Sequence, residues 1–224
     1  LHTRHLEEMV ASQVAEMTRM QDEVITGIAN LIESRDGSTG LHVKNTQNYV
    51  QILTKALREK GMYPDILDHN YELNTVKASV LHDIGKIKTP DAILLKPGRL
   101  TDEEFEVMKQ HTVAGCEIID RIIGNVEHEE YVDIARKIAR YHHERWDGTG
   151  YPDGLSGEEI PLCARIMALA DVFDALYQDR CYKKAIRPAS KVFEIIKENS
   201  GSQFDPNLTE IFLELQREIT DISE

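Results

Sequence analysis

Residues 141–155 read YHHERWDGTGYPDGL, a composition that is unusual for a surface loop. Two adjacent histidines are followed by the only tryptophan of the chain, Trp146, and then by three glycines and a proline. Glycine loses much conformational entropy on folding and proline removes a backbone donor, so this segment is expensive to order. A plain surface loop needs neither paired imidazoles nor such a rigid continuation. We therefore expect the segment to hold a functional site in place.

Helical periodicity surrounds this segment on both sides. Apolar residues recur with the period of an α-helix almost throughout the chain, whereas the alternation typical of strands is hard to find. The paired histidines end a helix predicted over 130–143. Thr101 and Glu104 have the spacing of a capping box, and Gly115 suggests a bend in the helix that follows. The other predicted helices cover 1–34, 42–60, 71–83, 101–123, 161–178, 188–199 and 206–219. The sequence predicts an all-α fold.

The first predicted helix carries a heptad seam with one polar interruption. Its members alternate in steps of four and three: Val10, Val14, Met17, Gln21, Val24, Ile28 and Leu31. Such spacing is typical of a helix that pairs with another helix. Two interpretations remain open at this stage. The helix packs on its own domain, or it pairs with a second copy of the chain and carries signals from an upstream domain.

Composition narrows the class of protein. The 224 residues suffice for one large domain, and a net charge of −13 argues against broad binding to nucleic acid or to an anionic membrane. We find no membrane span and no signal peptide, and the chain begins with Leu, so we expect it to be cut from a longer protein. The three cysteines, Cys116, Cys163 and Cys181, lack CxxC spacing, which favours reduced thiols and a cytoplasmic location.

Several histidines and carboxylates lie where a helix is expected to end. Side chains of adjacent residues on a regular helix point about 100° apart, so His82 and Asp83 can reach one target only at such an end, and the same holds for His142 and His143. Alone, each of these histidines is more often a surface or hydrogen-bonded residue. Together with His111 and Asp171 they supply ligands that suit Fe, Mn, Zn or Ni, and their number favours at least two metals that activate a water at a phosphoryl group.

These segments together resemble the HD-GYP phosphodiesterases, a branch of the HD metal-dependent phosphohydrolases. The similarity extends over about residues 24–220, and the central motif with Gly150, Tyr151 and Pro152 is highly specific. It implies an HD-superfamily helical bundle, residues 35–224, preceded by an N-terminal helical extension, residues 1–34. The matching segments are LHDIGKI (81–87), KQHTVAG (109–115), HHERWDGTGYPDGLSGEEIPL (142–162), ARIMALADVFDAL (164–176) and RCYKKA (180–185).

The resemblance implies an activity and a role for each matching residue. Members of the family hydrolyse cyclic dinucleotides, chiefly cyclic di-GMP to linear pGpG or GMP, at a centre of two or three metals, often iron or manganese. Asp83 and Lys86 would be catalytic, with Asp83 bridging two metals and Lys86 touching the scissile phosphate. Tyr151, Arg180 and Lys183 would bind substrate. The implied metal ligands are His42, His82, Asp83, His111, His142, His143 and Asp171.

Two departures from the family pattern modify these expectations. Many members with three metals carry Glu four residues before the first histidine ligand, but Ser38 stands there in this chain. We therefore expect two divalent ions, iron or manganese in the first place and zinc or nickel as alternatives, although Asp36 could contribute from nearby. Cys181 stands where the family usually has Pro, which would loosen the loop holding Arg180 and Lys183.

Alternatives from other classes follow from the same residues. The chain could hydrolyse another cyclic dinucleotide such as 3′3′-cGAMP, or bind a cyclic dinucleotide as a sensory module with little activity. The expected partners are the cyclic dinucleotide, a second copy of the chain through the N-terminal helix, and an upstream sensory or receiver domain.

Overall fold

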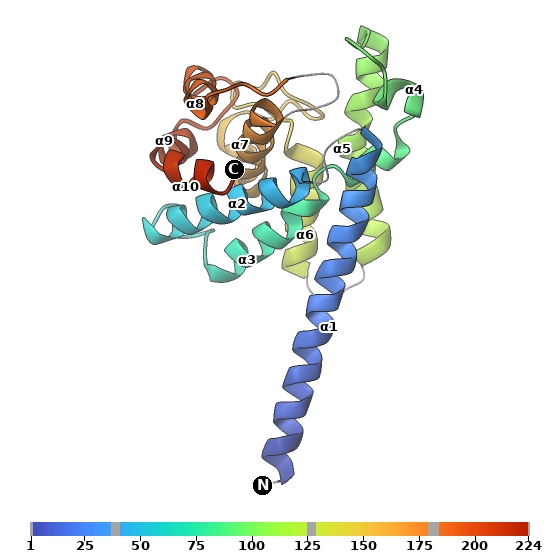
Figure 1. The fold of residues 1–224 in the computed structure, drawn as a ribbon, viewed down its shortest axis with the longest axis vertical. Helices are drawn as coiled ribbons and strands as arrows, with labels where there is room; N and C mark the ends of the chain where they lie inside the picture. The colour runs from blue at the N-terminus through green and yellow to red at the C-terminus, as the bar shows by residue number, and fades with distance from the viewer. Residues whose placement is uncertain (1, 37–40, 125–128, 179–183, 224) are drawn as a thin grey trace.

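The computed structural model describes residues 2–36, 41–124, 129–178 and 184–223, and the described part contains helices but no named strand. The predicted all-α fold is confirmed (Figure 1). Short 3-10 helices, η1 to η4, occupy Ser34–Asp36, Ser79–Leu81, Ile84–Lys88 and Gly157–Glu159. The α-helices are α1 His2–Glu33, α2 His42–Glu59, α3 His69–Ala78, α4 Asp91–Leu94, α5 Asp102–Ile123, α6 Glu129–Tyr141, α7 Leu162–Tyr177, α8 Ala189–Glu198, α9 Pro206–Glu214 and α10 Gln216–Asp221.

Helix α7 forms the centre of the body because it is apolar on nearly every side. From Leu162 to Ala170 every residue is buried, which is what a helix without a polar face requires. An aromatic cluster packs on its second half: the Phe173 ring lies 5.1 Å from that of Tyr49 on α2, 4.9 Å from Phe193 on α8 and 5.7 Å from Phe212 on α9. Helix α7 therefore joins α2 to α8 and α9 in one core.

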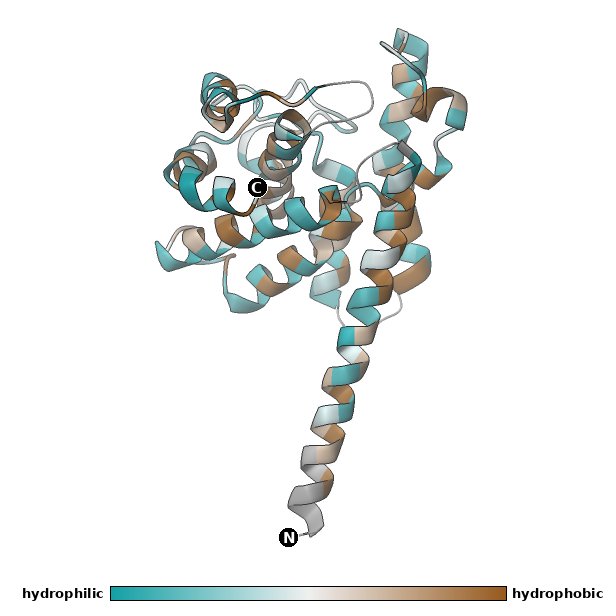
Figure 2. Cartoon of the chain, viewed as in Figure 1, coloured by the Kyte–Doolittle hydropathy of each residue, from teal (hydrophilic) through white to brown (hydrophobic). Residues whose placement is uncertain are grey.

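Helix α1 runs along the body at its C-terminal end and projects beyond it at its N-terminal end (Figures 1 and 2). Ala29 and Ile32 are buried against the body, at 3% and 4% exposure. The heptad seam faces elsewhere, since Val14, Met17 and Leu31 are 59%, 64% and 70% exposed. The helix therefore packs on its own domain at its C-terminal end, through a face other than the seam.

Several predicted helix boundaries change in the structure. The helix expected over 71–83 ends at Ala78 as an α-helix and continues as 3-10 turns, and α4 was not expected. The helix expected over 206–219 is divided at Leu215 into α9 and α10. The capping box is confirmed: the Glu104 amide donates to Thr101 Oγ1 at 3.3 Å, and the Thr101 amide donates to Glu104 Oε2 at 2.8 Å.

Helix α5 is continuous through Gly115, whose role is close packing. A Cβ atom on Gly85 in η3 would lie 1.8 Å from the carbonyl oxygen of His111, and one on Gly115 would lie 3.4 Å from the amide nitrogen of Gly85. The backbones of η3 and α5 can approach this closely because Gly85 lacks a side chain, whereas a Cβ on Gly115 would be only slightly tight. Gly85 thereby allows Asp83 to lie next to His111.

Within the described residues, no helix has both the length and the apolar character needed to cross a bilayer.

Candidate metal centre

Five segments far apart in the sequence deliver the predicted metal ligands to one place. His42 is the first residue of α2, and His111 lies midway along α5. His82 and Asp83 lie in the turn between η2 and η3, as the sequence predicts for a helix end. The remaining ligands come from the turn after α6, which carries His142 and His143, and from α7, which carries Asp171.

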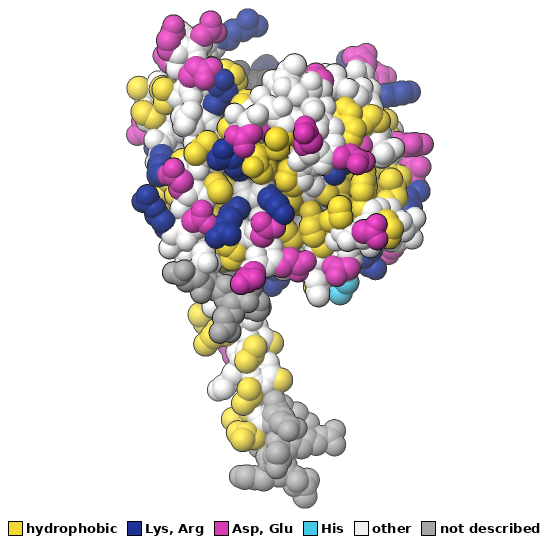
Figure 3. Space-filling view, turned by 180° about the vertical axis from the view of Figure 1, so that it is seen from behind, with side chains coloured by type: hydrophobic (Ala, Val, Ile, Leu, Met, Phe, Trp, Pro, Cys, Tyr) yellow, Lys and Arg dark blue, Asp and Glu magenta, His cyan; other side chains and the backbone are white. Residues whose placement is uncertain are grey.

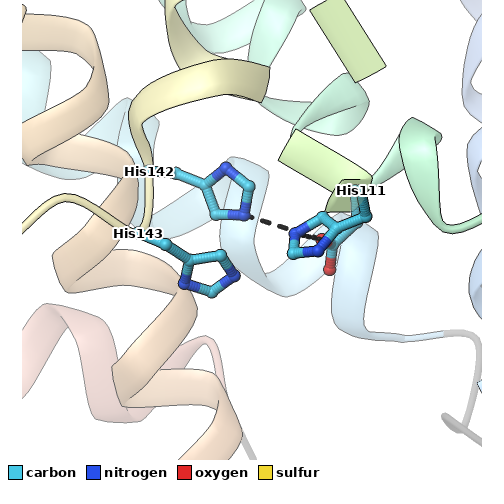
Figure 4. Close-up of side chains that lie close together, drawn as sticks. His111, His142 and His143 are labelled. Atoms are coloured by element: carbon cyan, nitrogen blue, oxygen red, sulfur yellow. Dashed lines mark ion pairs between the residues drawn. The ribbon is translucent and has the colours of Figure 1, made fainter. Parts of the chain in front are cut away.

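One group of possible ligands is formed by Asp83, His111, His142 and His143, each with a ligand atom within 4.8 Å of the others. Nε2 of His111 lies 3.2 Å from Asp83 Oδ1, and Nε2 of His142 lies 3.6 Å from the same oxygen. Figure 4 shows the paired histidines and His111 turned toward a common space from separate parts of the chain. Three imidazoles and a carboxylate match the ligand types that divalent transition metals prefer.

A second group adjoins the first and contains His42, His82 and Asp171, again within 4.8 Å of one another. Nε2 of His42 lies 3.3 Å from Nε2 of His82 and 3.5 Å from Asp171 Oδ1. His82 Nε2 in turn lies 3.4 Å from Asp83 Oδ2, the second oxygen of the carboxylate used by the first group. Asp83 thus stands between the two groups, and the seven predicted ligands form one cluster.

Hydrogen bonds on the far side of each ring orient the histidines. Nδ1 of His82 donates to the Ser79 carbonyl at 2.8 Å, and Nδ1 of His111 donates to the Met108 carbonyl at 2.7 Å. Nδ1 of His142 donates to the Ile138 carbonyl at 3.0 Å. Since a carbonyl can only accept, each of these rings keeps its proton on Nδ1 when neutral and presents the Nε2 lone pair to the cluster.

Three buried atoms facing the cluster lack a hydrogen-bond partner in the described part of the chain. Asp83 Oδ1, His111 Nε2 and His142 Nε2 are buried and make no hydrogen bond there. Buried polar atoms without partners are costly and rare, so their convergence indicates a missing charged ligand. These residues fit divalent metal ions.

Neighbouring charges keep the Asp83 carboxyl ionised, whereas burial favours the neutral form of His142 and His143. Burial alone would raise the pKa of Asp83, but the Lys86 ammonium and the His82 imidazole lower it well below its usual value. Burial lowers the pKa of His142 and of His143. Burial also opposes protonation of His82, yet the Asp83 carboxylate raises the pKa of His82 to about 9. Asp83, His142 and His143 are thus poised as ligands, with one proton to be displaced from His82.

The sequence model of the HD domain family matches residues 4–208. The chain belongs to the HD domain family. A cyclic di-GMP phosphodiesterase of Vibrio cholerae serotype O1 is 43% identical over 226 residues, and a 3′3′-cGAMP-specific phosphodiesterase of the same organism is 35% identical over 201 residues. The matches cover 100% and 90% of this chain but 45% and 36% of those relatives, so the chain spans less than half of either.

Solved structures confirm the HD architecture. A crystal structure of a cyclic GMP-AMP specific phosphodiesterase from Vibrio cholerae aligns with a TM-score of 0.59 at 20% identity, over 89% of this chain and 52% of that one. The motif at Gly150–Pro152 and the curated relatives bear out the HD-GYP branch that the resemblance indicated.

Two further carboxylates of this HD domain contact the cluster and were not expected from the sequence. Glu33 at the end of α1 is only 3% exposed and lies 3.1 Å from Lys86 Nζ, which lies 2.7 Å from Asp83 Oδ2. Asp174 on α7 accepts from His42 Nδ1 at 2.6 Å. Neither residue gave a sequence signal of its own, because the burial of Glu33 and the contact of Asp174 with His42 depend on how the helices pack.

The loop of the HD-GYP motif is braced by its own residues. The Glu144 carboxylate accepts from the amides of Asp153 and Gly154 at 2.7 and 3.0 Å. A Cβ on Gly150 would lie 2.4 Å from the Arg145 amide nitrogen, so only glycine allows this turn. The loop sets the Tyr151 ring 4.9 Å from the His143 ring.

Four residues with expected roles or departures lie outside the described residues: Ser38, Arg180, Cys181 and Lys183. The backbone of Asp36 is described as part of η1, but its side chain is not.

Proposed function

We propose that this HD-GYP domain is a metal-dependent phosphodiesterase that hydrolyses a cyclic dinucleotide, cyclic di-GMP in the first place, to linear pGpG, to GMP or to both. The observation that carries the proposal is the pair of adjoining histidine–carboxylate groups joined at Asp83, with the Lys86 ammonium 2.7 Å from that carboxylate. The curated relative named a cyclic di-GMP phosphodiesterase, 43% identical over the whole of this chain, supports the substrate.

The proposed cofactors are two divalent transition-metal ions, iron or manganese, with zinc or nickel as alternatives. His111, His142, His143 and Asp83 would hold one ion, and His42, His82, Asp171 and Asp83 the other. Such ions supply the activation of water and the polarisation of a phosphoryl group when they are bound. A third group, Glu33, His42 and Asp83, also has carboxylate and imidazole atoms within 4.8 Å. The Lys86 ammonium already lies beside both carboxylates, which supports two ions rather than three.

The side chains around the cluster have separate proposed roles toward the substrate. Lys86 holds a non-bridging oxygen of the scissile phosphate, because its ammonium lies beside the carboxylate shared by both ligand groups. Arg180 and Lys183 hold the second phosphate, and Tyr151 faces the dinucleotide from the braced loop. This local positive charge allows a chain with a net charge of −13 to bind a dianion.

A second candidate substrate is 3′3′-cGAMP, which the name of the relative at 35% identity favours. A third possibility is a sensory module that holds a cyclic dinucleotide without cleaving it. The complete set of seven ligands weighs against the sensory role, because binding alone needs no such cluster.

The proposed assembly is a homodimer formed through the exposed seam of α1, joined to an upstream sensory or receiver domain in the full protein. The seam offers apolar side chains at heptad spacing on a helix that projects from the body. The free thiols of Cys116 and Cys163 support a cytoplasmic location.

The function is tested by metal analysis and product analysis on the same samples. After anaerobic purification, we expect about two metal ions per chain, and incubation with cyclic di-GMP should yield pGpG or GMP on chromatography. Asp83→Ala should lose both metal and hydrolysis, because Asp83 joins the two ligand groups. An Asp83→Ala protein that keeps full metal content and activity would overturn the assignment, and binding of cyclic di-GMP by the wild type without cleavage would favour the sensory role.

A further inference from the structure

A row of aromatic rings leads from the candidate metal centre to the surface. The His143 ring, part of the first ligand group, lies 4.9 Å from the Tyr151 ring with an interplanar angle of 31°. The Tyr151 ring lies 5.9 Å from the Phe105 ring on α5, edge to face. Phe105 is 44% exposed, so the outer end of the row is open to solvent. The rings of His143, Tyr151 and Phe105 therefore form an aromatic wall that begins at the first ligand group and ends at an accessible apolar ring.

Lys109 places a positive charge over this wall. It lies one helical turn after Phe105, and its Nζ is 5.5 Å from the Phe105 ring centre and 5.8 Å from the Tyr151 ring centre. An ion pair of 2.5 Å with Glu106 holds the ammonium on this side of α5. Two residues further along the same helix is His111, so the lysine and a ligand of the centre share one rigid element.

Polar contacts fix the first turn of α5, next to the aromatic wall. The capping box of Thr101 and Glu104 closes the first turn, and Lys96 Nζ lies 2.5 Å from Glu104 Oε2. Phe105 follows directly after these contacts, so its ring is carried by an anchored turn. An exposed phenylalanine on its own is common on protein surfaces. Phe105 differs from such residues because its ring contacts the Tyr151 ring, which in turn contacts the ring of the predicted ligand His143.

We propose that Phe105, Tyr151 and Lys109 form a subsite for a guanine base of the substrate, a proposal that rests on the proposed function. Aromatic rings bind nucleobases by stacking, whatever the base. Lys109 distinguishes guanine from adenine, because guanine presents two acceptors, O6 and N7, where adenine presents the acceptor N7 and an amino donor. A nucleotide holds its base one sugar ring away from its phosphate, so a phosphate at Lys86 and the metals places a base against this wall. The subsite thus selects guanine over adenine.

The subsite is tested with mononucleotides, whose binding does not depend on cleavage. GMP, AMP and inorganic phosphate are titrated calorimetrically into the metal-loaded protein. Phe105→Ala should weaken GMP binding by about tenfold or more, since alanine removes the stacking surface, whereas Phe105→Trp should retain it. Lys109→Met should weaken GMP more than AMP and reduce the preference for GMP by roughly tenfold. Phosphate affinity and metal content should not change in any of these variants.

Ile122→Ala is the matched control, because Ile122 is an exposed apolar residue, 65% accessible, near the other end of α5. Three results would overturn the subsite: equal GMP affinity in Phe105→Ala and Ile122→Ala, a parallel loss of phosphate binding, or equal affinity of the wild type for GMP and AMP. If the wild type prefers GMP as described but never cleaves cyclic di-GMP, the proposed function fails and the subsite stands. If instead the wild type cleaves cyclic di-GMP and Phe105→Ala binds GMP as tightly as the wild type does, the subsite fails and the proposed function stands.

Discussion

At the scale of single residues, the candidate centre depends on groups behind the ligands as much as on the ligands. His82, His111 and His142 are held by backbone carbonyls, so their orientation follows from the helix turns that carry them. His42 differs because its Nδ1 donates to a side chain, Asp174, which also accepts from Asn45 Nδ2 at 3.2 Å. Partners of this kind fix ring orientation and raise ligand basicity.

We expect Asp174→Asn to weaken metal binding by about 10–100-fold while leaving the fold intact, because the amide keeps the shape of the carboxylate but loses its charge. Metal affinity measured by competition with a chelator, together with the unfolding midpoint, checks this. Asp133→Asn serves as control, since it removes only a surface ion pair with Lys137. Unchanged metal affinity in Asp174→Asn would show that Asp174 does not support His42.

Metal binding should release a proton and strengthen as the pH rises. With a pKa of about 9, His82 is protonated at neutral pH without metal, and a ligand must be deprotonated. The apparent affinity should therefore rise up to about pH 9 and level off above it. Calorimetric titration of metal at pH 7.5 in buffers of different ionisation enthalpy measures the proton released. The absence of proton release at that pH would contradict the assignment of His82 as a ligand.

At the scale of elements, the decisive contact is the one between η3 and α5. Gly85 lets the two backbones meet, and Asp83 Oδ1 lies 3.2 Å from His111 Nε2. The capping box at the start of α5 and the 3-10 turns around Asp83 then fix both sides of the contact.

Gly85→Ala should disrupt the centre and the fold together. Its Cβ would lie 1.8 Å from the His111 carbonyl oxygen, a backbone atom that cannot yield without moving α5. We expect a loss of stability of about 1–3 kcal/mol or more and a reduced metal content. Chemical unfolding and elemental analysis measure both. Gly27→Ala, in an open position on α1, should be neutral or slightly stabilising, and an equal effect of the two substitutions would refute the argument.

At the scale of the whole molecule, α1 links the candidate centre to the part of the described chain that projects from the body. One end of the helix places Glu33 beside Lys86, and the other end projects away from the body (Figure 1). Figure 3 shows apolar side chains along the projecting part, where no other element of the described chain covers them. A second copy of α1 is the partner that heptad spacing suits.

Val14→Glu should therefore shift the protein from dimer to monomer, because it introduces a charge into the seam. Ser12→Glu adds the same charge to an exposed position outside the seam and should leave the dimer intact. Solution mass by light scattering at several concentrations distinguishes the two states. A wild-type protein that is monomeric throughout, or a dimer that Val14→Glu leaves unchanged, would exclude the seam as the interface.

The sequence by itself predicted the helical class, most helix positions, the capping box at Thr101 and the seven candidate ligands that the structure brings together. These features are carried by local periodicity or by motifs that lie within short segments. Tertiary structure alone decided which face of α1 is buried, and it added Glu33, Asp174 and the wall of Phe105 and Tyr151. Such contacts join residues far apart along the chain, 132 positions for His42 and Asp174. No local pattern records them, because they depend on how closely the helices pack.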